Sequence, residues 1–542
     1  MFRVNNKHSQ SSMYESTEWM DPRIRSKLEK SWAPVFYEHV FCKINEEPFA
    51  VLYGTTGNPN FPVNIILSLE YIKHMKDCND LELMDSFYFD YLVNYAVGIR
   101  TLGEMNLAER TLYYFRERVY RYCIENPGAE DLLFGQFLHL LKNFAKEANI
   151  LLEEQRTDTT LFMSNIKKAG RMSLAYDVLV RAVREIPESR RPDTLSNVLG
   201  PDFKKGMLHS CKTAEIDGRL STLLALCKES LVILEAQCDI SASEVKGIVK
   251  RFLEEQTVVD AEGKVKVKSK KEITSGSLQS AYDEGATYHR KGNAGYIGYS
   301  LEISESCNSD NPFQLITDYS VEPNNVSDVD FLNKRLPIVK ANTGCVGMYV
   351  DGNFHSEKIH QTAGDHGIEI HLTNMGGGLQ PEQKLPVSAF DIDEVTNIIK
   401  KCPGGYVPIN GGLNKSQTSA YFPHEACASC HLNEFCYSKK LAKNCVVKIT
   451  IKAVKASRER EKIKVDKAEN TSKRAAIEGT NSALKRKGQD KLNVRGKTKV
   501  SIVSGLKVTA QNIKRFIKFK QGGYNPKSIP PPQFGTRAPT PA

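Results

Sequence analysis

The stretch from Thr471 to Lys499 carries the residue types best suited to chemistry on phosphates. Its composition favours a helix as far as Gly488, and Glu478 is its only acid before that glycine. Arg474 precedes Glu478 by four residues and Lys485 follows it by seven, so at about 100° per residue the three side chains share one helical face. There the acid could hold a metal ion while the cations hold phosphates. The alternative is a basic surface helix in which Glu478 pairs with Arg474.

Two further acids lie in or at the end of predicted strands. Asp158 stands in the β-branched run 157–165, which favours a strand, although an N-cap of a following helix is the alternative. Asp351 ends a short apolar strand, and functional residues of α/β sheets gather at such ends; simple loop punctuation is the alternative. With Glu478 they make three carboxylates, the kind of ligand set that holds two magnesium ions about 4 Å apart.

A cysteine-rich segment is the third chemical feature. Four of its cysteines have spacing compatible with a zinc site: Cys402, Cys427, Cys430 and Cys436. Thiolates in tetrahedral arrangement suit a structural Zn²⁺, with His431 and Cys445 as competing fourth ligands. A reduced loop without metal is the alternative, because the gap between Cys402 and Cys427 is long.

The charge distribution points to a polyanionic partner. The net charge is +10, and residues 446–520 hold 22 Lys and Arg against 6 Asp and Glu, so the excess is local. Such a segment is typical of binding to nucleic-acid phosphates. No run of about 20 apolar residues predicts a membrane span, and no secretory signal is expected at the N-terminus. The 13 cysteines, mostly scattered, fit a reducing cytoplasm.

The 542 residues are too many for one core, so several domains are expected. Residues 1–24 are predicted to be a flexible N-terminus and 25–150 a helical domain. One helix of that domain sets Arg116 and other arginines among tyrosines, a composition that could insert into a DNA groove. A plain helical bundle with an arginine-rich outer face is the alternative, because aromatic residues at helical spacing are more often core.

The remainder alternates between strands and helices, which predicts an α/β sheet within residues 151–520. Residues 166–260 are predicted to be a helical insertion and 376–445 a cysteine-rich one. The tail, 521–542, is proline-rich and predicted to be disordered.

Other cations are candidates for phosphate contacts. Arg290 and Lys291 enter a predicted strand together, and Lys497 follows the helix of Glu478. For Arg290 and Lys291 the alternative is a solvated loop tip.

Taken together, these segments resemble a bacterial insertion-sequence transposase of the DDE type. The matching segments are TDTTLFMSN, YHRKGNAGYIGYS, VDGNF, CASCHLNEFC and RAAIEGTNSALKR. In related transposases the third acid lies in a Tyr-x2-Arg-x3-Glu-x6-Lys pattern. Arg474, Glu478 and Lys485 match this pattern, whereas Thr471 stands at the position of the tyrosine.

The resemblance implies an RNase H-like catalytic domain of mixed α/β fold, interrupted by the two insertions and preceded by the all-helical N-terminal domain. It implies that Asp158, Asp351 and Glu478 hold two Mg²⁺ or Mn²⁺ ions and that Arg474 and Lys485 contact DNA. The enzyme would cut element ends to free 3′-hydroxyls and transfer them into target DNA, as a homodimer on paired ends in the bacterial nucleoid.

Two other functions remain open from the sequence. One is a catalytically inactive, transposase-derived DNA-binding protein. The only feature in its favour is Thr471, which departs from the tyrosine of the family pattern. The other is a metal-dependent DNA nuclease that shares the acids but accepts only water as nucleophile.

Overall fold

The computed structural model describes residues 1–9, 17–129, 131–209, 213–236, 240–259, 265–375, 384–414 and 416–523. Internal contacts divide the chain into two units. Unit 1 comprises 1–153, 157–344 and 477–542, and unit 2 comprises 154–156 and 345–476. The tail predicted to be disordered lies outside the described residues from 524 onward.

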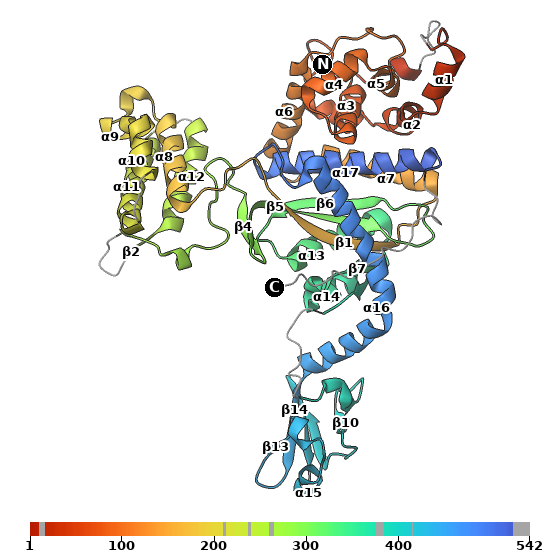
Figure 1. Ribbon diagram of the computed structural model, residues 1–542, viewed down its shortest axis with the longest axis vertical. Coiled ribbons are helices and arrows are strands. Elements are labelled where there is room, and N and C mark those ends of the chain that lie inside the picture. The colour runs from red at the N-terminus through yellow and green to blue at the C-terminus, as the bar shows by residue number, and fades with distance from the viewer. Residues whose placement is uncertain are drawn as a thin grey trace, which may run out of the picture. The chain divides into compact units, whose positions relative to one another are not determined.

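Unit 1 begins with helices, as the sequence predicts for residues 25–150 (Figure 1). The principal helices are α1 (Pro22–Glu29), α2 (Trp32–His39), α3 (Val63–Lys76), α4 (Asp80–Phe89), α5 (Tyr91–Ala96), α6 (Glu109–Glu125) and α7 (Leu132–Ala148). Local signals start them: Asn79 and Glu82 form a capping box on α4, and Asp131 caps α7. Helix α3 is buried from Val63 to Ile72, including its one acid, Glu70.

The first residues of the chain contact the helical domain. The amino group of Met1 donates hydrogen bonds to the carbonyls of Thr56 and Asn58, and the backbone N–H of Asn5 donates to the carboxylate of Glu46. These partners lie 41 to 57 residues along the chain, where no local sequence pattern reveals them.

The sheet of unit 1 is built on strand β5 (Ala294–Ser306). β5 pairs antiparallel with β4 (Thr287–Lys291) and with β6 (Ile316–Pro323), and it neighbours β1 (Glu154–Phe162). Helix α13 (Asp328–Thr343), which is capped by Ser327, follows β6. Residues 166–260 are mostly helical, and Figure 1 shows these helices gathered together, with the short strand β2 (Thr257–Val259) at their end. Their buried apolar side chains form a core cluster of their own. The helices are α8 (Arg171–Glu185), α9 (Asp193–Ser196), α10 (Pro201–Leu208), α11 (Ile216–Glu235) and α12 (Ile240–Gln256).

Helix α17 (Lys497–Lys520) is the central connector of unit 1. It packs on β6 and on α3 and α7, and it buries Val508, Ile513 and Phe516. Gly505 allows this approach, because a Cβ there would overlap the ring of Tyr319 on β6. The apolar face of α17 therefore closes the core of unit 1.

Unit 2 contains the parallel strands. The first three residues of β1 pair parallel with β7 (Gly347–Val350), which pairs parallel with β8 (Glu369–Leu372); α14 (Glu357–Asp365) connects β7 to β8. The cysteine-rich segment adds β9 (Asp391–Ile392) and β10 (Ile399–Lys401), which pair with each other. It also adds β11 (Asn410–Leu413), β12 (Gln417–Phe422), β13 (Lys439–Lys440) and β14 (Cys445–Thr450), an antiparallel sheet, and α15 (His424–Ala428). Helix α16 (Ile451–Leu484) follows and crosses from unit 2 into unit 1 at Ile477.

Candidate active site

Asp158 lies inside strand β1, so the sequence prediction of a strand is confirmed and the N-cap alternative is wrong. The preceding residue, Thr157, is buried and donates from its hydroxyl to the carbonyl of Ile303 at 2.9 Å, which fixes β1 against β5. The Asp158 side chain is half-buried, and its Oδ2 accepts a hydrogen bond from Nδ2 of Asn481 at 3.0 Å. Strand and helix thus meet at this carboxylate.

Glu478 lies on α16, as predicted, at the exposed margin of the helix. Its neighbours Ile477, Thr480 and Asn481 are buried, so they form the face that packs into unit 1. Residues three apart on a helix lie on the same side, with Cβ atoms about 5–6 Å apart. Asn481 donates a hydrogen bond to Asp158. Glu478 therefore lies one helical turn before a residue that contacts Asp158.

A buried network fixes this end of α16. Glu305 on β5 is fully buried, and it accepts hydrogen bonds from the hydroxyl of Thr480, at 2.8 Å, and from the guanidinium of Arg515 on α17. Arg515 also donates to the Thr480 hydroxyl, at 2.6 Å. Thr480 is two residues beyond Glu478, so strand, helix and C-terminal helix jointly set the position of that acid.

Glu302 is a second buried acid of β5. It is 2% exposed, and neither carboxylate oxygen has a hydrogen-bond partner among the described residues. Burial, followed by the negative charge of Asp318, raises the pKa of Glu302 well above its ordinary value, although Arg335 opposes this; Asp158 also contributes to the rise. Burial of Glu302 therefore favours the neutral, protonated form of its side chain.

Replacing Glu302 by Gln is expected to remove a pH-dependent part of the stability. Because the folded-state pKa is raised, the contribution of Glu302 is fully present below its unfolded pKa and is lost as the pH rises through the folded value. Gln does not titrate, so the free energy of unfolding should fall less steeply between mildly acidic and alkaline pH than in the wild type. Urea unfolding across that range measures this. Parallel curves for the wild type, Glu302→Gln and the exposed control Glu29→Gln would contradict it.

Asp351 lies in unit 2, directly after β7, as predicted. Its side chain accepts a hydrogen bond from the N–H of Gly352 and starts a 3-10 turn, η8 (Gly352–Phe354), so it serves the turn as well as ending the strand. The guanidinium of Arg474 approaches its Oδ2 to 4.0 Å. Nearby, Lys473 donates to Glu154 at 2.8 Å and to the hydroxyl of Tyr349 at 3.0 Å, which ties α16 to β1 and β7 within unit 2.

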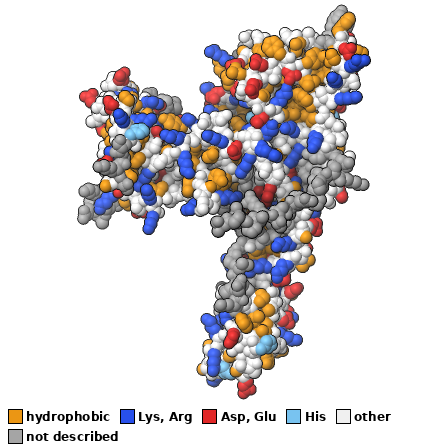
Figure 2. Space-filling model, viewed as in Figure 1, with side chains coloured by type: hydrophobic (Ala, Val, Ile, Leu, Met, Phe, Trp, Pro, Cys, Tyr) orange, Lys and Arg blue, Asp and Glu red, His pale blue; other side chains and the backbone are white. Residues whose placement is uncertain are grey.

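Most of the cations predicted to contact DNA are exposed to solvent. They are Lys485, Arg290, Lys291 and Lys497. Arg290 and Lys291 end β4 beside the turn to β5, so they lie on a hairpin rather than in an irregular loop. Lys497 pairs with Glu322 at 2.5 Å and stands at the start of α17, which has no acid; Figure 2 shows Lys and Arg side chains along this helix.

Arg116 differs from the other predicted DNA contacts. Its guanidinium donates to Glu70 at 2.7 Å and to both carboxylate oxygens of Asp80 at 2.8 and 2.7 Å. These bonds hold Arg116 inside the helical domain, so we do not retain it as a DNA contact.

The four cysteines predicted to bind zinc line one small hollow of unit 2: Cys402, Cys427, Cys430 and Cys436. Burial, a hydrogen bond with Cys445 and the nearby Cys436 and Cys402 raise the pKa of Cys427 to about 12. Cys445 also lies 3.6 Å from Nδ1 of His424, whereas His431 is exposed. The four sulfur atoms of the predicted set do not all lie within 4.8 Å of one another. The fold therefore brings the four thiols to one hollow, but it does not place their sulfur atoms at the mutual distances of four ligands on one metal ion.

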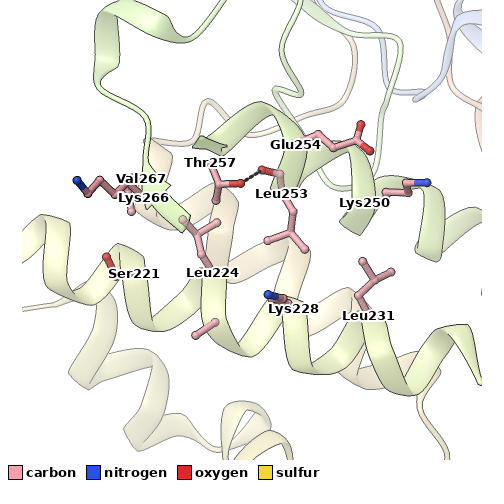
Figure 3. Close-up of a pocket in the computed structure, with 11 residues that line it drawn as sticks. Ser221, Leu224, Lys228, Leu231, Lys250, Leu253, Glu254, Thr257, Lys266 and Val267 are labelled. Atoms are coloured by element: carbon pink, nitrogen blue, oxygen red, sulfur yellow. Dashed lines mark hydrogen bonds between the residues drawn. The ribbon is translucent and has the colours of Figure 1, made fainter. Parts of the chain in front are cut away.

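A separate cavity of about 420 Å³ lies in the helical insertion (Figure 3). Three lysines, Lys228, Lys250 and Lys266, stand around an apolar floor that includes Leu224 and Leu253. Its one carboxylate, Glu254, is too few for a two-metal site. No motif in the sequence marks this cavity.

A family model described as a transposase DDE domain matches residues 404–517. The match supports a DDE transposase. It includes Arg474, Glu478 and Lys485 and most of the cysteine segment, but neither Asp158 nor Asp351. In the searches of curated proteins and of solved structures, nothing matches. Among the described helices, none has the length and apolar character needed to cross a bilayer.

Proposed function

We propose that this chain is an insertion-sequence transposase that cuts the ends of its element and joins the freed 3′-hydroxyls to target DNA. The observation that carries the proposal is the link between Asp158 and α16: Asn481 binds the first acid one turn beyond Glu478, inside the segment matched by the DDE family model. A non-catalytic DNA-binding descendant would not need an acid of β1 tied to the helix that carries Glu478.

We further propose an RNase H-like catalytic core. Within unit 1, β5 pairs antiparallel with β6 and neighbours β1; within unit 2, β1 and β7 are parallel and so are β7 and β8. Antiparallel strands followed by parallel ones are consistent with that fold. The parallel register of unit 2 sets Arg156 opposite Tyr349, two residues before the strand end at which Asp351 stands.

The three acids suit divalent metal ions because they supply hard oxygen ligands from a strand, a strand end and a helix. Bound Mg²⁺ or Mn²⁺ ions would lower the pKa of the attacking water and stabilise the leaving oxygen. Asp158, Asp351 and Glu478 would hold them. In the first step the water oxygen bonds to phosphorus, the P–O3′ bond breaks, and the 3′ oxygen leaves as a hydroxyl. In the second that hydroxyl attacks a target phosphorus and a target 3′-hydroxyl leaves.

The DNA backbone would be held by exposed cations. Lys485 lies two turns beyond Glu478 on the same helix and its π-helical extension, and Arg290, Lys291 and Lys497 belong to the same unit as Asp158. Arg474, beside Asp351, would orient that acid or contact the scissile phosphate. We propose that two copies of the chain act on the paired ends.

The test is a cleavage and joining assay with purified protein, DNA carrying the terminal repeats that flank its own gene, and Mg²⁺ or Mn²⁺. The proposal predicts metal-dependent release of 3′ ends and their covalent joining to a second DNA. Cleavage without joining would instead identify a nuclease. Binding without cleavage under either metal would identify a DNA-binding descendant.

We propose in addition that the cysteine hollow binds one structural Zn²⁺. Changing both Cys427 and Cys430 to Ser should release one zinc per chain, because a tetrahedral site does not survive the loss of two ligands. Elemental analysis of protein purified without added metal measures the zinc content. The buried Cys227, which lies in the helical insertion, supplies the control Cys227→Ser. Absence of zinc from the unmutated protein would remove this proposal.

A further inference from the structure

A second cluster of metal-binding residue types lies in unit 2, apart from the cysteines. His355 directly follows the η8 turn, His360 lies on α14, and Glu459 lies on α16. Each offers one ligand atom, and the three atoms lie within 4.8 Å of one another. Across the described part of the chain, this is the only group of three or more histidines, cysteines or acids that meets this distance.

The contacts inside the cluster leave room for an ion. Nε2 of His360 lies 3.6 Å from a carboxylate oxygen of Glu459, which is too long for a hydrogen bond. That nitrogen is buried and has no hydrogen-bond partner among the described residues. Two ligand atoms about 2.0–2.1 Å from a tetrahedral zinc lie about 3.3–3.4 Å apart, so the observed gap is close to the separation that a shared cation imposes.

The two imidazoles are arranged compatibly. Their ring centroids are 5.7 Å apart and their planes make an angle of 69°, so they meet edge to face and do not stack. Two imidazole nitrogens and one carboxylate form a ligand set suited to Zn²⁺ and its transition-metal neighbours, whereas Mg²⁺ prefers oxygen ligands throughout. Three protein ligands also leave a coordination position for water.

We propose that His355, His360 and Glu459 bind one divalent transition-metal ion, with Zn²⁺ as the expected occupant. The ion would tie the turn that Asp351 begins to helix α16. The backbone N–H of His355 donates to the carbonyl of Gly352 and closes that turn, and α16 carries Arg474 toward Asp351. Metal binding here does not depend on the proposed transposase function, because it involves none of the three catalytic acids.

The test is a Co²⁺ titration of the full chain after removal of bound metal with a chelator, followed by absorption spectroscopy. Thiolate ligands give intense charge-transfer bands with Co²⁺, so the cysteine hollow can be recognised separately from a nitrogen and oxygen site. His360→Ala and Glu459→Gln should each bind one equivalent of Co²⁺ less than the wild type and keep the charge-transfer bands. The exposed His366, in the same unit, supplies the control His366→Ala, which should bind as the wild type does.

Variants that lose the metal ion should still fold, because a second contact joins the same two helices. Lys455 forms an ion pair with Glu357 at 3.3 Å and so joins α16 to α14 independently. Thermal unfolding with and without ZnCl₂ adds a second readout: zinc should raise the Tm of Asp351→Asn and of the wild type by more than that of Glu459→Gln. Equal Co²⁺ stoichiometry in all variants, or equal zinc-dependent shifts, would show that the cluster is an ion pair only and would overturn the proposal.

Discussion

Asp158→Asn is expected to lower metal-dependent DNA cleavage by at least about a thousandfold while leaving DNA binding nearly unchanged. Metal ions contribute several kcal/mol to such reactions, and each 1.36 kcal/mol is a factor of ten in rate. Asn keeps the size of the side chain and an oxygen that can accept the hydrogen bond from Asn481, so the junction of β1 with α16 should persist. What disappears is the negative charge that a divalent ion requires.

The measurement compares single-turnover cleavage of end DNA with its equilibrium binding at one salt concentration. Asp310→Asn, at an exposed turn of unit 1, is the matched control and should cleave as the wild type does. Equal cleavage by Asp158→Asn and the wild type would exclude a metal-binding role. Loss of both cleavage and binding, together with a lowered Tm, would show instead that Asp158 serves the fold.

The strands and helices that carry the acids were predictable because their signals are local. An apolar run ends at Asp351, and helix-forming composition surrounds Glu478; the structure confirms both elements. The acids could therefore be assigned to a strand, a strand end and a helix.

The burial of β5 could not be predicted in the same way. Polar residues alternate along it at Ser300, Glu302, Ser304 and Ser306, a pattern typical of a sheet with one solvated face. All four are buried, because α13 contacts this part of the sheet and α17 contacts its neighbour β6. Only tertiary packing decides whether the polar face of an alternating strand is exposed to solvent. The sequence therefore contains no indication that Glu302 is buried.

The partners of the acids were missed for a related reason. Asn481 follows Glu478 by three residues, and helical spacing alone places it on the same side. Its bond to Asp158, however, spans 323 residues. Glu305 and Arg515 are likewise 210 residues apart. Sequence spacing indicates which side chains share one face of a helix. It does not indicate which distant residues of the chain pack against that face.

Arg116→Ala is expected to destabilise the helical domain by about 3–5 kcal/mol, the cost of removing one partner from a buried ion pair. Glu70 is 2% exposed and lies on α3, the most buried helix of the domain. The loss of the Arg116 guanidinium would leave the Glu70 carboxylate without this cation. Burial alone would raise the pKa of Asp80, but hydrogen bonds from Arg116 and Lys73 hold that pKa well below its ordinary range. In the variant Asp80 keeps Lys73, so the larger loss falls on Glu70.

Chemical denaturation of the wild type, Arg116→Ala and Arg121→Ala measures the difference. Arg121 lies on the same helix with its side chain 67% exposed and pairs with Glu117 one turn away, so its loss should cost about 0.5 kcal/mol or less. The same three proteins, tested for DNA binding under conditions where all are folded, separate the two roles of Arg116. If Arg116→Ala kept wild-type stability but lost DNA affinity, the guanidinium would act on DNA and the ion pairs with Glu70 and Asp80 would be incidental.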